Sequence, residues 1–203
     1  MRLILASQSL RRSSLLRAAG FEFDIVEPAG VDETRRERED PIVYVARAAH
    51  AKALRVAKDY PDCCVIGADT IVIIDGEILG KPTSDDDATR MLRLLSGQTH
   101  KVLTGMAVHV SGRQMSEVRE TRVSFSRLTE TEIKWYVRSG EPRDKAGGYA
   151  IQGLASRFVS GIEGSYSNVV GLPIETLHRL LAHIESEQLP RSLFNALQKS
   201  DPL

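Results

Sequence analysis

The first residues of the chain combine hydroxyl and guanidinium side chains in a pattern that suits phosphate binding. A short apolar run, 3–5, is followed by Ser7, Ser9, Arg11 and Arg12. The run predicts a strand, and the residues from Leu10 onward predict a helix. The free N–H groups and dipole of a helix N-terminus attract anions, and arginine binds phosphate oxygens bidentately. The same residues equally allow a serine that only caps the helix, with solvated arginines.

Asp69 is the carboxylate whose position most needs an explanation. It ends a continuous apolar run, 63–68, which predicts a strand buried on both faces. A charge in such a place is costly unless it is paired or binds a metal. Its position at a strand end also fits the rule that ligands of α/β proteins bind at the carboxyl ends of strands. The alternative is a structural aspartate that caps a turn.

Three further charged residues could belong to the same site. Glu33 lies in a polar stretch, 28–40, Lys52 lies in an apolar helical pattern, and Lys81 follows a predicted hairpin. Taken singly, such a stretch is more often a solvated connector, and a lysine on a helix is usually solvated. Together, Glu33 and Asp69 could hold a divalent cation, because Mg²⁺ prefers carboxylates, water and phosphates. The chain has no Walker-type loop, so the set favours metal-assisted hydrolysis of a phosphate ester or anhydride.

The elements that must position these residues alternate between strand and helix patterns in the first half of the chain. This alternation, with a hairpin in the middle, predicts an α/β fold with a mixed sheet. The first helix is expected to bury Leu15, Leu16, Ala18 and Ala19, and Thr129 with Glu132 predicts a capping box. The other expected elements are strands at 21–26, 63–74, 77–79, 100–110, 117–126 and near 158–159, helices from Pro41, at 85–95, after Thr129 and at 174–183, and a glycine-rich loop at 141–153.

The composition describes a globular protein with no overall charge. Of 203 residues, 27 are Lys or Arg and 27 are Asp or Glu, so nothing drives general binding to nucleic acid or to an anionic membrane. Aromatic residues make up only 5%, which argues against binding of single strands by base stacking. No apolar stretch approaches the roughly 20 residues of a membrane span. Adjacent Cys63 and Cys64 are expected to be reduced thiols, which favours a cytoplasmic protein.

An ordered set of short motifs then identifies a family resemblance. The motifs are Leu-Ala-Ser-Gln-Ser-Leu-Arg-Arg at 5–12, Glu33, Lys52-Ala53, Gly67-Ala68-Asp69-Thr70, Gly80-Lys81-Pro82, Ser96-Gly97-Gln98-Thr99-His100, Asp144-Lys145-Ala146-Gly147, Ile151-Gln152-Gly153 and Val170-Gly171-Leu172-Pro173. The set resembles the Maf nucleotide pyrophosphatases, also called septum-formation-inhibitor-like proteins. Arg12, Thr70 and Gln152 match the positions that mark the subgroup acting on dTTP and UTP.

The resemblance implies a fold, a reaction and a set of site residues. The fold is a mixed sheet with helices on both faces and two lobes around a cleft, similar to inosine triphosphate pyrophosphatase. Residues 1–184 would form a single domain, and 185–203 a loosely attached tail. The reaction is hydrolysis of a nucleoside triphosphate to the monophosphate and pyrophosphate with Mg²⁺ or Mn²⁺. The implied residues are Asp69 for catalysis, Glu33 and Asp69 for the metal, and Ser7, Ser9, Arg12, Lys52, Thr70, Lys81 and Gln152 for the substrate.

Chemical roles follow for these residues. Lys52 and Lys81 would neutralise charge on the pyrophosphate leaving group, and Asp69 would activate water. The Gln152 amide can match N3–H and O4 of uracil or thymine, and a flipped amide can match cytosine too. The expected partner is a small nucleotide, and a homodimer is compatible with the sequence. Two alternatives stay open at this point, a nucleotide-binding regulator of cell division without turnover and an inosine-triphosphate-type enzyme.

Overall fold

One mixed β-sheet organises the protein. The computed structural model describes residues 2–188, and its sheet has the strand order β2-β1-β3-β5-β6-β7, with β4 paired to β3. β1 runs parallel to β2 and β3, and the other pairs are antiparallel. The strands are β1 (Leu3–Leu5), β2 (Asp24–Ile25), β3 (Cys64–Ile74), β4 (Glu77–Leu79), β5 (Thr99–Val110), β6 (Arg113–Phe125) and β7 (Val159–Glu163).

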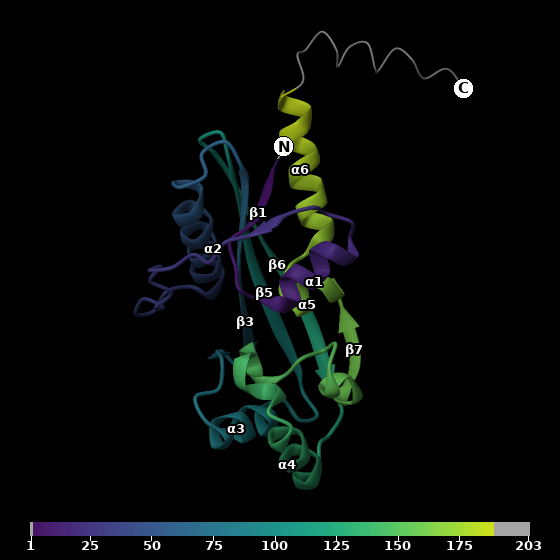
Figure 1. The fold of residues 1–203 in the computed structure, drawn as a ribbon. Helices are drawn as coiled ribbons and strands as arrows, with labels where there is room; N and C mark the ends of the chain where they lie inside the picture. Colours follow the sequence, from purple (N-terminus) through teal and green to yellow (C-terminus); the bar gives the residue numbers. More distant parts are fainter. Residues whose placement is uncertain (1, 189–203) are drawn as a thin grey trace, which may run out of the picture.

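Helices cover both faces of this sheet, as predicted. The helices are α1 (Leu10–Ala18), α2 (Pro41–Ala57), α3 (Asp85–Leu95), α4 (Glu130–Arg138), α5 (Tyr166–Val170) and α6 (Ile174–Gln188). Successive residues of a strand face opposite sides of the sheet. Val65 of β3 therefore packs with Ala53 of α2, while Ile66 packs with Leu16 of α1 and Leu177 of α6. Figure 1 shows α2 on one side of the sheet and α1, α5 and α6 on the other.

A second lobe lies beyond the ends of the long strands. There α3, α4 and three short 3₁₀ turns (Glu141–Asp144, Ala146–Gly148 and Leu154–Phe158) surround an apolar cluster. Val72 of β3, Leu92 of α3 and Tyr136 of α4 belong to this cluster. Figure 1 shows α3 and α4 together at one end of the molecule. The predicted two-lobed mixed α/β architecture is confirmed.

Two glycines allow α2 to lie very close to the sheet. A Cβ on Gly67 of β3 would lie 2.3 Å from the carbonyl oxygen of Ala49, and one on Gly105 of β5 would lie 2.2 Å from that of Val45. Real Cβ contacts are never so short, so only glycine permits this approach. The approach sets the position of every side chain that α2 directs at the middle of β3.

Several local expectations need correction. The expected strand at 21–26 is reduced to Asp24–Ile25, because only these residues pair with the short β1. The first helix buries Ser13 and Leu16, and the alanines expected on its buried side, Ala18 and Ala19, are exposed because the helix ends there.

Other elements differ at their ends. β6 begins at Arg113, earlier than expected, because its pairing with β5 extends to the hairpin turn. The loop at 141–153 contains 3₁₀ turns, and the strand expected near 158–159 runs from Val159 to Glu163. α6 continues to Gln188, so it includes the first residues of the expected tail, whereas 189–203 lie outside the described residues. Across 2–188, no helix has the length and apolar composition that a membrane span requires.

Candidate active site

A cleft of about 680 Å³ lies between the two lobes. Its walls come from the loop after β1, the N-terminus of α1, the middle of β3 and the 3₁₀ turns of the second lobe. All the site residues expected from the sequence line this cleft, namely Ser7, Ser9, Arg12, Glu33, Lys52, Asp69, Thr70, Lys81 and Gln152. The structure therefore brings together residues from distant parts of the chain.

The middle of β3 forms the floor of the cleft. β1 pairs with β3 only as far as Ile66, and β4 pairs with it only from Val72. Within the described chain, the edge of β3 between these points has no partner strand. Asp69 lies inside β3, not at a strand end as predicted from the apolar run, because the antiparallel pairing with β5 continues to Ile73. The strand whose carboxyl end borders the cleft is the much shorter β1, since the loop that follows it lines the cleft.

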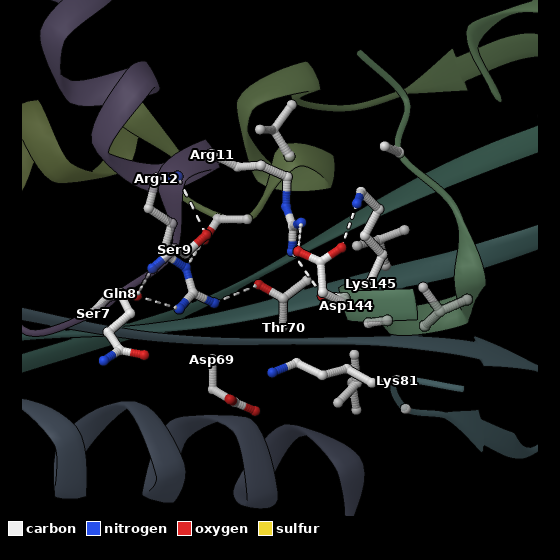
Figure 2. A pocket seen from close by; sticks show the side chains of 18 of the residues that line it. Ser7, Gln8, Ser9, Arg11, Arg12, Asp69, Thr70, Lys81, Asp144 and Lys145 are labelled. Atoms are coloured by element: carbon white, nitrogen blue, oxygen red, sulfur yellow. Dashed lines mark hydrogen bonds and ion pairs between the residues drawn. The ribbon is translucent and has the colours of Figure 1, made fainter. Parts of the chain in front are cut away.

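Asp69 and Thr70 point to opposite sides of β3, because side chains alternate along a strand. Asp69 lies opposite Gly105, on the face covered by α2, and Thr70 lies opposite Thr104 on the other face. Figure 2 shows Thr70 directed toward Arg12, while Asp69 projects to the other side of the strand. Two neighbouring residues thus contribute to two separate clusters of polar side chains.

The first cluster is a buried lysine between two carboxylates. Lys52 Nζ lies 2.7 Å from Asp69 Oδ1 and 2.7 Å from Glu33 Oε2. Lys52 and Asp69 are both buried, and the side chain of Glu33 is half-exposed. The expectation that Lys52, as a lysine on a helix, is solvated is therefore wrong. Asp69 does not cap a turn either, because its carboxylate binds this ammonium group.

The second cluster surrounds Arg12 with acceptors. Its guanidinium donates to the carbonyl oxygen of Gly171 at 2.8 Å, to Ser7 Oγ at 3.2 Å and to Thr70 Oγ1 at 3.3 Å. Burial lowers the pKa of Arg12 from its ordinary value, and the nearby Asp69 opposes this shift. An arginine keeps its charge at neutral pH in any case. Ser9 caps α1 by accepting from the backbone N–H of Arg12, so the capping interpretation holds for this serine.

Two expected substrate contacts have side chains that remain free. Lys81 and Gln152 are exposed at the cleft. Within residues 2–188, neither side chain makes a hydrogen bond or ion pair. In Figure 2 the Lys81 ammonium group extends toward Asp69. A free cation and a free amide at a cleft wall are available to a ligand without breaking an internal bond.

Comparison with known proteins identifies the family. Residues 2–184 match the family described as Maf-like protein. The chain belongs to the Maf-like protein family. A dTTP/UTP pyrophosphatase of Koribacter versatilis is 51% identical, with 89% of this chain and 93% of the relative covered. One of Shewanella denitrificans is 48% identical, covering 88% and 94%. Among solved structures, the Ham1 protein of Staphylococcus aureus aligns with 93% of this chain and 100% of its own at 11% identity and a TM-score of 0.46.

This Maf-like protein also has an ion-pair group that connects the two lobes. Arg11 of α1 donates to Asp144 Oδ2 at 3.0 Å and to the Asp144 carbonyl oxygen at 3.3 Å, and Lys145 pairs with the same carboxylate. All three line the cleft. Sequence reasoning noted the charge-dense stretch at 141–153 but did not connect it with Arg11. That connection depends on how the second lobe docks, which no local pattern encodes.

The carboxylates of the cleft also fit a divalent cation bound together with phosphates. Glu33 and Asp69 converge on one ammonium group, and within residues 2–188 the second oxygen of each carboxylate accepts no hydrogen bond. The described part of the chain has no cluster of three or more His, Cys, Asp or Glu residues that could hold a metal. Mg²⁺ commonly takes one or two carboxylates, with water and substrate phosphates completing its shell. The donor set in this Maf-like protein is of that kind.

Proposed function

We propose that this protein is a nucleoside triphosphate pyrophosphatase that hydrolyses dTTP and UTP to the monophosphate and pyrophosphate. The observation that carries the proposal is the cleft in which Asp69, Lys52 and Arg12 meet, each held by the contacts described above. Two relatives whose sequences are 51% and 48% identical to this chain are named dTTP/UTP pyrophosphatase, which supports the choice of substrates. The cleft volume of about 680 Å³ falls within the range of about 300–1,000 Å³ that is usual for small-molecule sites.

Asp69 is the proposed general base. It is the buried carboxylate of the cleft floor, and its free oxygen can accept a proton from a water molecule directed at the α-phosphorus. Lys52 holds the other carboxylate oxygen and thereby fixes the orientation of Asp69. A base held in this way needs little rearrangement when the proton is transferred.

Cations of the cleft would stabilise the pyrophosphate leaving group. Arg12 binds the triphosphate, and Lys52 and Lys81 neutralise the negative charge that develops as the anhydride bond breaks. Because Lys81 has no internal partner within the described residues, it can bind phosphate without losing another interaction. Ser7 and the N-terminus of α1, capped by Ser9, complete the anion-binding wall.

A divalent metal would be held by Glu33 and Asp69. When bound, Mg²⁺ or Mn²⁺ would supply charge neutralisation and Lewis-acid activation at the phosphate oxygens. Isothermal calorimetry tests this assignment, since Glu33→Gln should weaken metal binding while the protein stays folded.

Gln152 would select the base. Its exposed amide can donate to O4 and accept from N3–H of uracil or thymine. ATP and GTP present different edges at the same position, and leaving the amide unpaired would disfavour them.

The reaction can be tested in ¹⁸O-labelled water with UTP and Mg²⁺. We expect UMP and pyrophosphate, with the label in UMP, because water attacks the α-phosphorus. Label in inorganic phosphate with UDP as the coproduct would contradict the proposal. Binding of UTP without turnover would instead describe a nucleotide-binding regulator.

We further propose that the protein acts in the cytoplasm. Cys63 and Cys64 are both buried, and buried cysteines that stay reduced as thiols are typical of proteins in a reducing compartment. The formal net charge of zero supports the absence of a nucleic-acid partner. Dimerisation stays a prediction, which light scattering coupled to size-exclusion chromatography would test.

A further inference from the structure

A chain of hydrogen bonds begins at Arg12 and Thr70 on the cleft wall and ends at buried residues behind them. Arg12 donates to Thr70 Oγ1, which lies 3.0 Å from Thr104 Oγ1. Thr104 Oγ1 in turn donates to the carbonyl oxygen of Asn168 at 3.0 Å. Thr104 and Asn168 are each 0% exposed. The chain therefore runs from the cleft into the interior.

The direction of these bonds follows from counting protons. A carbonyl oxygen only accepts, so Thr104 must donate its single hydroxyl proton to the carbonyl oxygen of Asn168. In the bond between the two threonines, Thr104 is then the acceptor and Thr70 the donor. The Thr70 oxygen is left with its lone pairs toward Arg12, which donates to it. Thr104 thus determines that Thr70 presents an acceptor to the guanidinium.

The end of the chain is firmly anchored. The Asn168 side-chain amide donates to the carbonyl oxygen of Val102 on β5 and to Thr121 Oγ1 on β6. These bonds hold α5 against the sheet. The carbonyl oxygen of Gly171, directly after α5, accepts from Arg12 Nε. The same anchor therefore supports two of the acceptors that hold the guanidinium.

We propose that Thr104 is a positioning residue for the reaction, which orients Arg12 for the triphosphate through the hydroxyl of Thr70. This inference rests on the proposed function and deepens it. Without the Thr104 hydroxyl, Thr70 would lose the acceptor for its proton. Its hydroxyl could then rotate that proton toward Arg12, where it would oppose the guanidinium. Arg12 would become less ordered, and binding of phosphate would weaken.

The decisive variant is Thr104→Val, which removes the hydroxyl and keeps the branched shape. We expect KM for UTP to rise about 5-fold, the typical effect of one lost hydrogen bond, with a smaller change in kcat. Because the effect acts on phosphate binding, the UTP-to-CTP ratio of kcat/KM should stay constant. Thr104→Ser, which keeps the hydroxyl, should restore KM. Thr99→Val is the matched control, because Thr99 lies on the same strand and, among the described residues, its hydroxyl bonds to Ser124 alone, at an exposed site.

A double-mutant cycle with Arg12 distinguishes positioning from general damage. In an Arg12→Ala background, Thr104→Val should have no further effect on KM, because the guanidinium that Thr104 orients is absent. An equal effect in both backgrounds would overturn the proposal, as would a Thr104→Val enzyme with unchanged KM or with an altered UTP-to-CTP ratio. Urea unfolding of each variant checks that the fold is intact.

Binding of inorganic pyrophosphate provides a readout that is independent of turnover. Calorimetry on the wild type and Thr104→Val should show about 5-fold weaker binding by the variant, restored by Thr104→Ser. If the wild type failed to hydrolyse UTP, the proposed function would fall while this comparison still tested the positioning of Arg12. If the wild type hydrolysed UTP but both proteins bound pyrophosphate equally, only the role of Thr104 would fall.

Discussion

Lys52 Nζ lies 2.7 Å from Asp69 Oδ1 on the α2 face of the sheet, with both residues buried. The pair exists because Gly67 and Gly105 let α2 approach the strands closely. A carboxylate in the middle of a buried strand would otherwise be costly. The same contact that removes this cost also orients the proposed general base.

Replacing Asp69 with asparagine should nearly abolish hydrolysis and preserve the fold. Removal of a general base usually lowers the rate by about 10²–10⁴-fold. Lys52 keeps Glu33 as a partner, so the ammonium group is not left unpaired. Turnover of UTP by the purified variant checks this. Asp75→Asn, at an exposed position in the turn directly after the same strand, should retain full activity. Near-normal turnover by Asp69→Asn would remove Asp69 from the catalytic role.

Replacing Lys52 with methionine should destabilise the protein by about 3 kcal/mol, because it leaves a buried carboxylate without its cation. Adding Asp69→Asn should recover part of this loss, since the uncompensated charge is then gone. Urea unfolding at pH 7 measures both. The control is Lys101→Met, which breaks an exposed pair with Glu120 and should cost less than about 1 kcal/mol. Equal losses from the two lysine variants would contradict the structural account.

Replacing Gln152 with glutamate should weaken base selectivity more than it lowers the best rate. The carboxylate can accept from N3–H but cannot donate to O4. An unpaired group of this kind costs about 1–3 kcal/mol, or roughly 5- to 150-fold in relative kcat/KM. The measurement compares UTP, dTTP, CTP, ATP and GTP on both proteins. Unchanged ratios would show that Gln152 does not contact the base.

His100 should make the protein less stable as the pH falls below neutral. Its ring is buried between Phe125 and Tyr149, and Nε2 lies 2.8 Å from the Tyr149 hydroxyl. Burial lowers the pKa of His100 from 6.5 to about 4. Between these values the unfolded chain binds a proton that the folded state does not, so the free energy of unfolding decreases as pH falls from about 6.5 to about 4.

The full contribution of His100 would be about 3 kcal/mol, from roughly 1.4 kcal/mol per pKa unit. Urea unfolding at pH 7 and pH 5, compared with His100→Phe, isolates it. The variant should lose less stability between the two pH values than the wild type does. Burial also lowers the pKa of His109, but this residue is present in both proteins and its contribution cancels. Identical pH dependence in the two proteins would contradict the assignment.

The sequence by itself determined the local elements and the chemical character of the site. The capping box of Thr129 and Glu132 forms as predicted. The apolar run predicted at 63–68 forms the first part of β3, which begins at Cys64 and is buried from that residue onward. Such features depend on neighbours within a few residues, so periodicity and capping rules detect them. The sequence also identified Arg12 from its charge and hydroxyl neighbours, which suit phosphate, Asp69 from its position at the end of an apolar run, and Lys52 as a further cation.

Only the tertiary structure decided which of these residues contact one another. Lys52 meets Asp69 across 17 residues, Arg11 meets Asp144 across 133, and Arg12 meets Gly171 across 159. Each contact depends on the docking of one element on another, which is set by the packing of whole faces and by the close approach at Gly67 and Gly105. Local sequence patterns carry no such information, because the energies that decide docking are summed over residues far apart in the chain.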